Sequence, residues 1–373
     1  MIGTRKKKTS ILVDEEFINH LKELQYQNYC TLQTLFESYL FSLKPEFWKG
    51  IIAELTNVIG KCDEIDFQKD EMAVAYAIWH FLDRYHRFQI MLQTLIDKGC
   101  LIYKECRYDV LDIGTGPSQT LFALSDYFSE LNCIDGSANI FLKSEYVERS
   151  EGFRNFLHRF VEFAMMKEKR YLVPFHFAKS TDAFNIPFNE TVPSWYKRSR
   201  DIKIKSRYDI VVFNNFLTNP DFMNTFTEQL KTICRFIRNN GLLIVIGARN
   251  QLPKYAEVYS IIQSIVLRRF NHRKFFGYWS KIVDREYDYK YDDQFGEELR
   301  KHYEHIVSFL KMTPLEGNGE ECLWDLVSET DRDLFARRMG KEDNNLGIKW
   351  KMVVYQKHSF FKGKVQFTRD YTG

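Results

Sequence analysis

The spacing of apolar residues changes along this chain, and the change predicts a helical region followed by an α/β sheet. Over residues 14–101 apolar positions recur every three or four residues, as on one face of a helix, and Glu71–Ile96 is the longest such segment. Further along, short and nearly continuous apolar runs alternate with helical patterns, as expected for parallel strands covered on both faces. We therefore predict an N-terminal helical region at residues 1–104 and an α/β domain at residues 105–373.

Six apolar runs are candidate strands of a Rossmann-like sheet, mostly parallel with an antiparallel last strand. Amphipathic patterns at Gln119–Phe128 and Phe222–Ile237 predict helices between them, and Gly136–Leu142 is expected to open another. The final run, Ile348–Tyr355, is expected to be the antiparallel strand. The other candidate strands are Tyr108–Leu111, Leu131–Asp135, Leu172–Phe177, Tyr208–Phe213 and Leu242–Ile246.

A glycine turn follows the first candidate strand and is the most informative feature of the chain. Asp112 ends the strand, and Gly114 and Gly116 permit a tight turn in which the backbone can approach a ligand closely. The helix that begins near Gln119 directs its amino end at this turn. A pyrophosphate site needs a third glycine, whereas Ser118 stands at that position. An ordinary connection between a strand and a helix is the alternative interpretation.

The DxGxG spacing of this turn resembles motif I of class I S-adenosylmethionine (SAM) methyltransferases. The resemblance covers residues 108–250 and includes the fourth candidate strand and the Asn239-Asn240-Gly241 segment before the fifth. It implies a class I methyltransferase sheet with SAM as the cofactor, whose amino-acid end the strand-end acid and the glycines receive. The cofactor-binding residues expected in this turn are Asp112, Gly114, Thr115, Gly116 and Pro117.

Two later acids complete the predicted cofactor site. Asp135 ends the second candidate strand and is placed to accept hydrogen bonds from ribose hydroxyls, with Gly136 and Ser137 beside it. Asp182 follows the third candidate strand, where the resemblance implies a contact with the adenine amino group. A solvated loop acid is the alternative interpretation of Asp182.

The loop after the fourth candidate strand borders the methyl group in the family that the chain resembles. Asn214, Asn215 and Phe216 are therefore the candidate catalytic residues, and Asn214 is also a candidate cofactor ligand. The loop lacks the [DN]PP[FY] pattern used on exocyclic amines, and the sequence contains no Pro-Cys pair of the pyrimidine C5 type. Tyr76 and His80 are expected to reach the mouth of the pocket from the preceding helix.

RNA is the leading predicted acceptor. The segment Ala75–His80 resembles a helix before motif I in methyltransferase-like proteins of small ribosomal subunits, although the cysteines thought to hold a metal cluster there have no counterpart here. Basic runs at residues 1–10, 197–207 and 268–274 are expected to be solvated surfaces, with contact to RNA or DNA as the alternative interpretation. The other functions considered are methylation of a small molecule or a protein, and a non-catalytic SAM-binding module acting through partners.

The amino-acid composition limits the class of protein to which the chain can belong. The chain has 45% hydrophobic and 28% charged residues and a net charge of only +3, which fits a globular protein rather than a strongly basic nucleic-acid binder. The seven dispersed cysteines predict no metal site and no disulfide framework. No apolar run suits a membrane span or signal peptide, so we expect a cytoplasmic protein. Residues 183–207 are expected to form an insertion and residues 271–345 a C-terminal extension.

Overall fold

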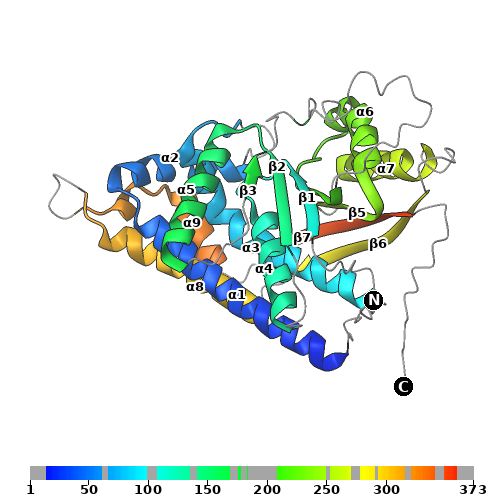
Figure 1. Ribbon diagram of the computed structural model, residues 1–373. Coiled ribbons are helices and arrows are strands. Elements are labelled where there is room, and N and C mark those ends of the chain that lie inside the picture. The colour runs from blue at the N-terminus through cyan, green and yellow to red at the C-terminus, as the bar shows by residue number, and fades with distance from the viewer. Residues whose placement is uncertain are drawn as a thin grey trace.

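A seven-stranded sheet lies at the centre of the molecule (Figure 1). The structure is a computed structural model that describes residues 14–60, 66–98, 107–134, 141–168, 175–177, 183, 208–248, 253–269, 278–289, 293–315, 321–340 and 348–358. The strands in these residues are β1 (Arg107–Ile113), β2 (Phe141–Val147), β3 (Phe175–Phe177), β4 (Tyr208–Asn214), β5 (Ile237–Ala248), β6 (Tyr278–Tyr289) and β7 (Ile348–His358).

The strands follow the order β3-β2-β1-β4-β5-β7-β6. The first five pair in parallel, whereas β7 lies antiparallel between β5 and β6. Parallel neighbours cannot be joined by a hairpin, so their connections cross a face of the sheet. The predicted Rossmann-like sheet, mostly parallel with an antiparallel last strand, is confirmed.

Most strands were predictable because burial on both faces leaves an apolar run in the sequence. All seven residues of β4 are buried, and β5 and β7 likewise lie where such runs predicted them. β6 was not predicted as a strand. It forms the edge of the sheet, and only Trp279 and Val283 are buried among its described side chains, so its sequence mixes apolar with charged residues.

The predicted second strand at Leu131–Asp135 is wrong. Leu131 to Ile134 instead form the last turn of α4 (Gln119–Ile134). The helix continues because Leu131 extends the buried face of Leu124 and Phe128, at intervals of four and three residues.

The second strand of the sheet is β2, which begins where a helix was expected at Gly136–Leu142. Its pairing with β1 runs parallel from Arg107 opposite Phe141 to Ile113 opposite Val147. The sequence pattern did not reveal β2 because two of its buried residues are polar: Ser144 and Glu145. The predicted third strand is confirmed only at β3, the end of the proposed run.

Helices cover both faces of the sheet and enclose two hydrophobic cores. Successive residues of β1 alternate between them, with Val110 in one core and Leu111 in the other. Figure 1 shows α6 and α7 on one side of the sheet and the other labelled helices on the opposite side. The helices besides α4 are α1 (Glu15–Phe41), α2 (Pro45–Gly60), α3 (Asp70–Asp97), α5 (Glu151–Glu168), α6 (Pro220–Phe236), α7 (Pro253–Gln263) with a π-helical turn (Ser264–Arg269), α8 (Gln294–Met312), a 3-10 turn (Leu323–Leu326) and α9 (Glu329–Arg338).

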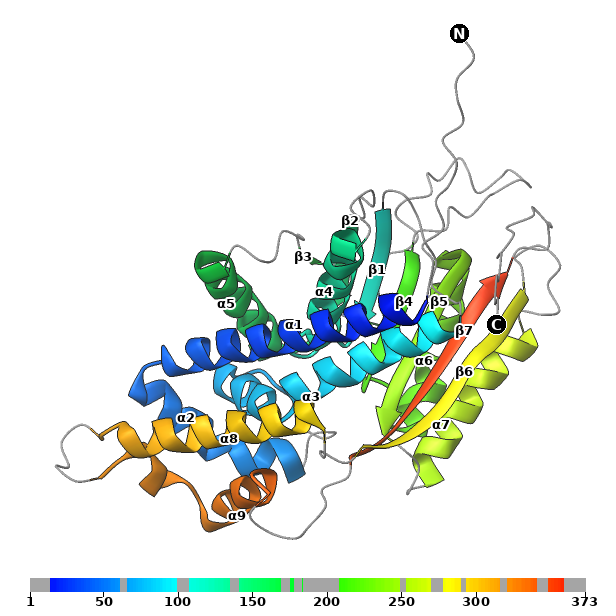
Figure 2. The same ribbon diagram turned by 90° about the horizontal axis from the view of Figure 1, so that it is seen from below.

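Helices that are distant in the sequence pack together beside the sheet (Figure 2). The predicted helical character of the N-terminal region is confirmed by α1, α2 and α3. In the predicted extension at residues 271–345, α8 and α9 lie between β6 and β7 in the chain and pack on these helices. Trp79 of α3 contacts Phe335 of α9 with ring centroids 4.6 Å apart, and its carbonyl accepts a hydrogen bond from Tyr303 of α8. None of the described helices combines the length and hydrophobicity needed to cross a lipid bilayer.

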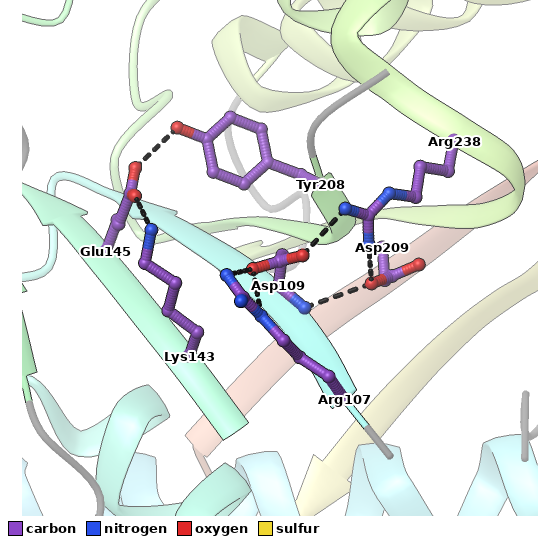
Figure 3. Close-up of polar contacts among 7 residues, drawn as sticks. All are labelled: Arg107, Asp109, Lys143, Glu145, Tyr208, Asp209 and Arg238. Atoms are coloured by element: carbon purple, nitrogen blue, oxygen red, sulfur yellow. Dashed lines mark hydrogen bonds and ion pairs between the residues drawn. The ribbon is translucent and has the colours of Figure 1, made fainter. Parts of the chain in front are cut away.

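A charged network links β1, β4 and β5 near the amino ends of β1 and β4 (Figure 3). The Arg238 guanidinium donates to Asp209 at 2.5 Å and to Asp109 at 2.7 Å, and the backbone N–H of Asp109 donates to Asp209 at 3.0 Å. Both carboxylate side chains are at most 9% exposed, so their charges depend on protein partners rather than water. Arg107 supplies a second cation to Asp109. The network therefore fixes three adjacent strands relative to one another.

We expect Arg238→Met to lower the free energy of unfolding by roughly 3 kcal/mol, because it leaves two buried carboxylates short of a partner. Urea denaturation followed by circular dichroism measures the change. Lys281→Met is the control, because it removes a more exposed ion pair with Asp284 on β6 and should cost less than about 1 kcal/mol. Equal losses in the two variants would show that the network contributes no more than a surface pair.

Candidate functional site

The connection between β1 and α4 adopts left-handed backbone conformations at three positions. The φ angle is +68° at Gly114, +54° at Gly116 and +63° at Ser118. Glycine adopts this region readily, but serine rarely does. Ser118 is fully buried, and its hydroxyl lies 3.0 Å from the hydroxyl of Thr115, which holds it in place. Backbone strain of this kind concentrates at ligand-binding sites, so the turn is a candidate for one.

The two glycines of the turn have different surroundings. A Cβ atom at Gly114 would overlap the ring of Phe216, so this glycine lets the loop after β4 pack against the turn. A Cβ atom at Gly116 would meet nothing within 4 Å. The sequence predicted that both glycines leave room for a ligand, but the first makes room for a side chain of the protein. Gly116 is the position at which a ligand can approach the backbone.

Asp112 is fully buried at the end of β1. Its Oδ2 accepts a hydrogen bond from the Thr115 hydroxyl at 2.5 Å, whereas its Oδ1 has no donor among the described residues. Burial raises the pKa of Asp112 to about 7, and the nearby carboxylate of Glu148 acts in the same direction. The Oε1 atom of Gln119, at the start of α4, is likewise buried without a donor in the described part of the chain. Two acceptors beside the turn can therefore bind donors from a ligand.

Glu148 lies directly after β2 and connects two loops at the carboxyl edge of the sheet. Its Oε2 accepts the N–H of Gly116 at 2.8 Å, and its Oε1 accepts the N–H of Ser150 at 2.9 Å. Burial raises the pKa of Glu148, while these hydrogen bonds oppose the shift. The strand-end acid next to β1 is therefore Glu148, whereas the sequence assigned that position to Asp135.

Sequence reasoning missed Glu148 because it placed the second strand ten residues too early, at Leu131 rather than Phe141. The available signal was Tyr146-Val147-Glu148, two buried apolar residues followed by an acid. Four residues of the predicted site lie outside the described residues: Asp135, Gly136, Ser137 and Asp182.

The predicted catalytic residues lie at the carboxyl end of β4, beside the glycine turn. The Asn214 side chain is buried and donates to the Thr120 hydroxyl of α4 at 3.0 Å. Asn215 adopts a φ angle of +56°, and its amide donates to the Asn214 side-chain oxygen at 2.8 Å. Phe216 stacks on Phe213, with ring centroids 5.9 Å apart. The loop thus places the hydrogen-bonded side-chain amide of Asn214 and the aromatic ring of Phe216 beside the glycine turn.

The structure brings together most of the described residues that the sequence proposed. Asp112, Thr115, Gly116 and Pro117 line the connection from β1, and Asn214 meets the first turn of α4 through Thr120. Within the described part of the chain, no group of three His, Cys, Asp or Glu side chains could hold a metal ion. The arrangement offers buried acceptors and backbone near one open position, which suits an organic ligand with polar donors.

We expect Asp112→Asn to stabilise the ligand-free protein at pH 8. With a pKa of about 7 in the folded state and 3.8 as its ordinary value, Asp112 costs stability progressively as the pH rises from 4 to 7, and fully above 7. The variant lacks this titration. Its advantage should approach about 4 kcal/mol at most above pH 7 and shrink toward zero near pH 4. Urea denaturation at pH 5 and pH 8 tests this; a difference between variant and wild type that is independent of pH contradicts it.

Comparison with solved structures finds methyltransferases at low sequence identity. Solved structures similar to this chain include coclaurine N-methyltransferase bound to N-methylheliamine and SAH (15% identity, 93% of this chain and 90% of that chain, TM-score 0.37). Another is phosphoethanolamine N-methyltransferase 2 of Haemonchus contortus with phosphomonomethylethanolamine and S-adenosylhomocysteine (15% identity, 80% and 60% of the two chains, TM-score 0.40). A third is a SAM-dependent methyltransferase of Methanosarcina mazei (14% identity, 69% and 95%, TM-score 0.30).

No protein-family model and no curated protein sequence matches the chain. The strand order of its sheet identifies the fold. Five parallel strands in the order β3-β2-β1-β4-β5 are followed by the antiparallel β7 and by β6 at the edge. The chain therefore has the fold of the class I SAM-dependent methyltransferases.

Proposed function

We propose that the chain is a SAM-dependent methyltransferase that binds SAM across the carboxyl ends of β1, β2 and β4. The observation that carries the proposal is the environment of Gly116. Its left-handed backbone borders open space, and its N–H is held by the acid that ends the neighbouring strand. Ligands of open α/β sheets bind at the carboxyl edge, at the point where the strand order changes direction, which here lies between β1 and β4.

The polar groups around the turn fit SAM. The acceptors Asp112 Oδ1 and Gln119 Oε1 lack donors among the described residues, and the ammonium group of the methionyl part would supply them. A cation beside Asp112 would also favour its ionised form and offset the effect of burial. Glu148, as the acid after the second strand, would accept hydrogen bonds from the ribose hydroxyls.

Methyl transfer requires alignment more than acid–base chemistry. SAM supplies a methyl group on a sulfonium, and the rate depends on aligning the acceptor nucleophile, the methyl carbon and the leaving sulfur. In this chain the alignment falls to the loop after β4. The hydrogen bond to Thr120 fixes the Asn214 amide, and Phe216, packed on Gly114, gives this side of the site an apolar wall. Asn215 keeps the loop turned by its left-handed conformation.

We expect Glu148→Gln to weaken SAM binding by roughly 1–3 kcal/mol, because the neutral amide is a poorer acceptor for the ribose hydroxyls and for the N–H of Gly116. Isothermal titration calorimetry measures the change. Glu145→Gln is the matched control, since it alters a buried acid within β2 that pairs with Tyr208 and Lys143 instead.

Asp135→Ala is the competing arm of this experiment. If it weakens binding and Glu148→Gln does not, the ribose contact belongs to Asp135, as the sequence suggested. If the folded wild-type protein shows no heat of binding with SAM, the proposed function is wrong.

We propose RNA as the methyl acceptor, with two alternatives. RNA is the leading candidate because of the resemblance at Ala75–His80, and the basic runs at 1–10, 197–207 and 268–274, most of which lie outside the described residues, are the segments that could contact it. A small molecule or a protein is the enzymatic alternative, and a non-catalytic SAM-binding module is the other. Conversion of SAM to S-adenosylhomocysteine in the presence of an acceptor separates the catalytic from the non-catalytic functions. We also propose that the protein is cytoplasmic.

If RNA is the acceptor, neutralising Lys197, Arg198, Arg200 and Lys205 should weaken RNA binding and flatten its salt dependence. Each lost phosphate contact on a single strand should reduce the slope of log affinity against log salt by about 0.7. Filter binding at several salt concentrations measures both quantities, with SAM affinity as the control for folding. An unchanged slope would favour a small-molecule or protein acceptor.

A further inference from the structure

One face of α3 carries polar residues at intervals of four: Tyr76, His80 and Arg84. This spacing places them in a row along the helix. The row is internally bonded, because the Arg84 guanidinium donates to the Tyr76 hydroxyl and also lies over the Tyr76 ring, 4.9 Å from its centroid. The Tyr76 and His80 rings contact each other at 4.7 Å. We call these three residues the α3 row.

Tyr76, at one end of the α3 row, lies close to the edge of the sheet that carries the proposed cofactor site. Tyr76 packs on Phe153 in the first turn of α5, with centroids 5.3 Å apart, and α5 begins directly after the loop from Glu148 to Ser150. Phe81, between His80 and Arg84, meets Phe122 near the start of α4 at 5.5 Å. The Tyr76 end of the row therefore lies beside the start of α5, which follows Glu148, and the adjoining residue Phe81 of α3 contacts α4 near its start.

Positive charge is concentrated around the row. Burial, and after it the charges of Arg84, Arg338 of α9 and Arg87, hold the pKa of His80 well below its usual value, and no acid is among the groups that shift it. Arg87 is neutralised by two hydrogen bonds to Asp83. The charge of Arg84 has no such partner: its buried Nε lacks an acceptor, and no carboxylate of the described residues pairs with it.

A half-buried guanidinium without an anion is costly to maintain, so it points to a ligand that supplies the charge. We infer that the α3 row binds an anionic group, a phosphate or a carboxylate, of a small methyl acceptor, which is the enzymatic alternative to RNA. The planar donors of Arg84 suit two oxygens of such a group. The Tyr76 hydroxyl and the neutral His80 ring can bond a third oxygen or the linking atom. This inference rests on the proposed function, since it is the cofactor site next to the row that would make the bound molecule a methyl acceptor.

The experiment measures the thermal midpoint of the protein in inorganic phosphate, acetate and chloride at matched ionic strength. A ligand that binds only the folded state raises the midpoint in a saturable way. We expect saturable stabilisation of the wild type by phosphate or by acetate relative to chloride, and the more effective anion identifies the acceptor group. Arg84→Met should abolish the effect. Arg84→Lys should weaken the apparent affinity about tenfold, because it keeps the charge but loses the paired donors.

Arg332→Met is the matched control. Arg332 is also half-buried, but it donates to the backbone carbonyls of Trp324 and Asp325 rather than to the α3 row. This control should retain the anion response. Without added anion, Arg84→Met should have a higher midpoint than the wild type, since an uncompensated charge is removed. A lower midpoint, or an anion response equal to that of the wild type, overturns the inference.

SAM titration of the same proteins keeps this result separate from the proposed function. Wild-type protein that binds SAM but shows no saturable anion response disproves the anion site alone. Wild-type protein that responds to anion but does not bind SAM disproves the methyltransferase instead. Single-stranded RNA is tested in the same way. If RNA raises the midpoint of the wild type and of Arg84→Met equally, RNA binds elsewhere on the chain. The α3 row then belongs to a small molecule if phosphate or acetate stabilises the wild type, and the inference is wrong if neither anion does.

Discussion

The carboxylate of Glu148 is the contact on which the architecture of the site depends. With two hydrogen bonds it fixes the turn after β1 and the start of α5 against each other. The position of α5 then places Phe153 against Tyr76, and Tyr76 in turn holds Arg84. One buried acid thus connects the cofactor side of the site to the α3 row. Because the carboxylate accepts from backbone amides, substitutions elsewhere in the two loops need not disturb it.

Parts of the fold were predictable because the determining information is local. The turn after β1 needs left-handed backbone, and Gly114 and Gly116 indicate this in the sequence because glycine adopts that conformation readily. The β4 strand is apolar because both of its faces are covered. β2 was not predictable in this way. Its buried Glu145 depends on Tyr208, sixty-three residues later, as well as on its neighbour Lys143, and a reader of the local sequence cannot see the first of these partners.

The same limit explains which site residues were found. Asp112 and Asn214 end strands with clear apolar runs, so their positions could be read directly. Glu148 ends a strand without such a run and was replaced in the prediction by Asp135, an acid at a plausible distance along the chain. The overlap between Gly114 and Phe216 could not have been inferred either, since it depends on how closely the loops after β1 and β4 approach.

The position of β7 has a consequence for the order in which the protein is made. β6 pairs with β7 and not with β5, although β5 and β6 come first in the chain and α8 and α9 separate β6 from β7. During synthesis one edge of β5 therefore stays unpaired, and β6 lacks the strand with which it pairs, until residues 348–358 emerge and insert between β5 and β6. Pairings of such large sequence separation form slowly. The nascent chain thus passes through a stage in which two open strand edges can recruit the wrong partner, and this stage ends only with one of the last strands of the described chain.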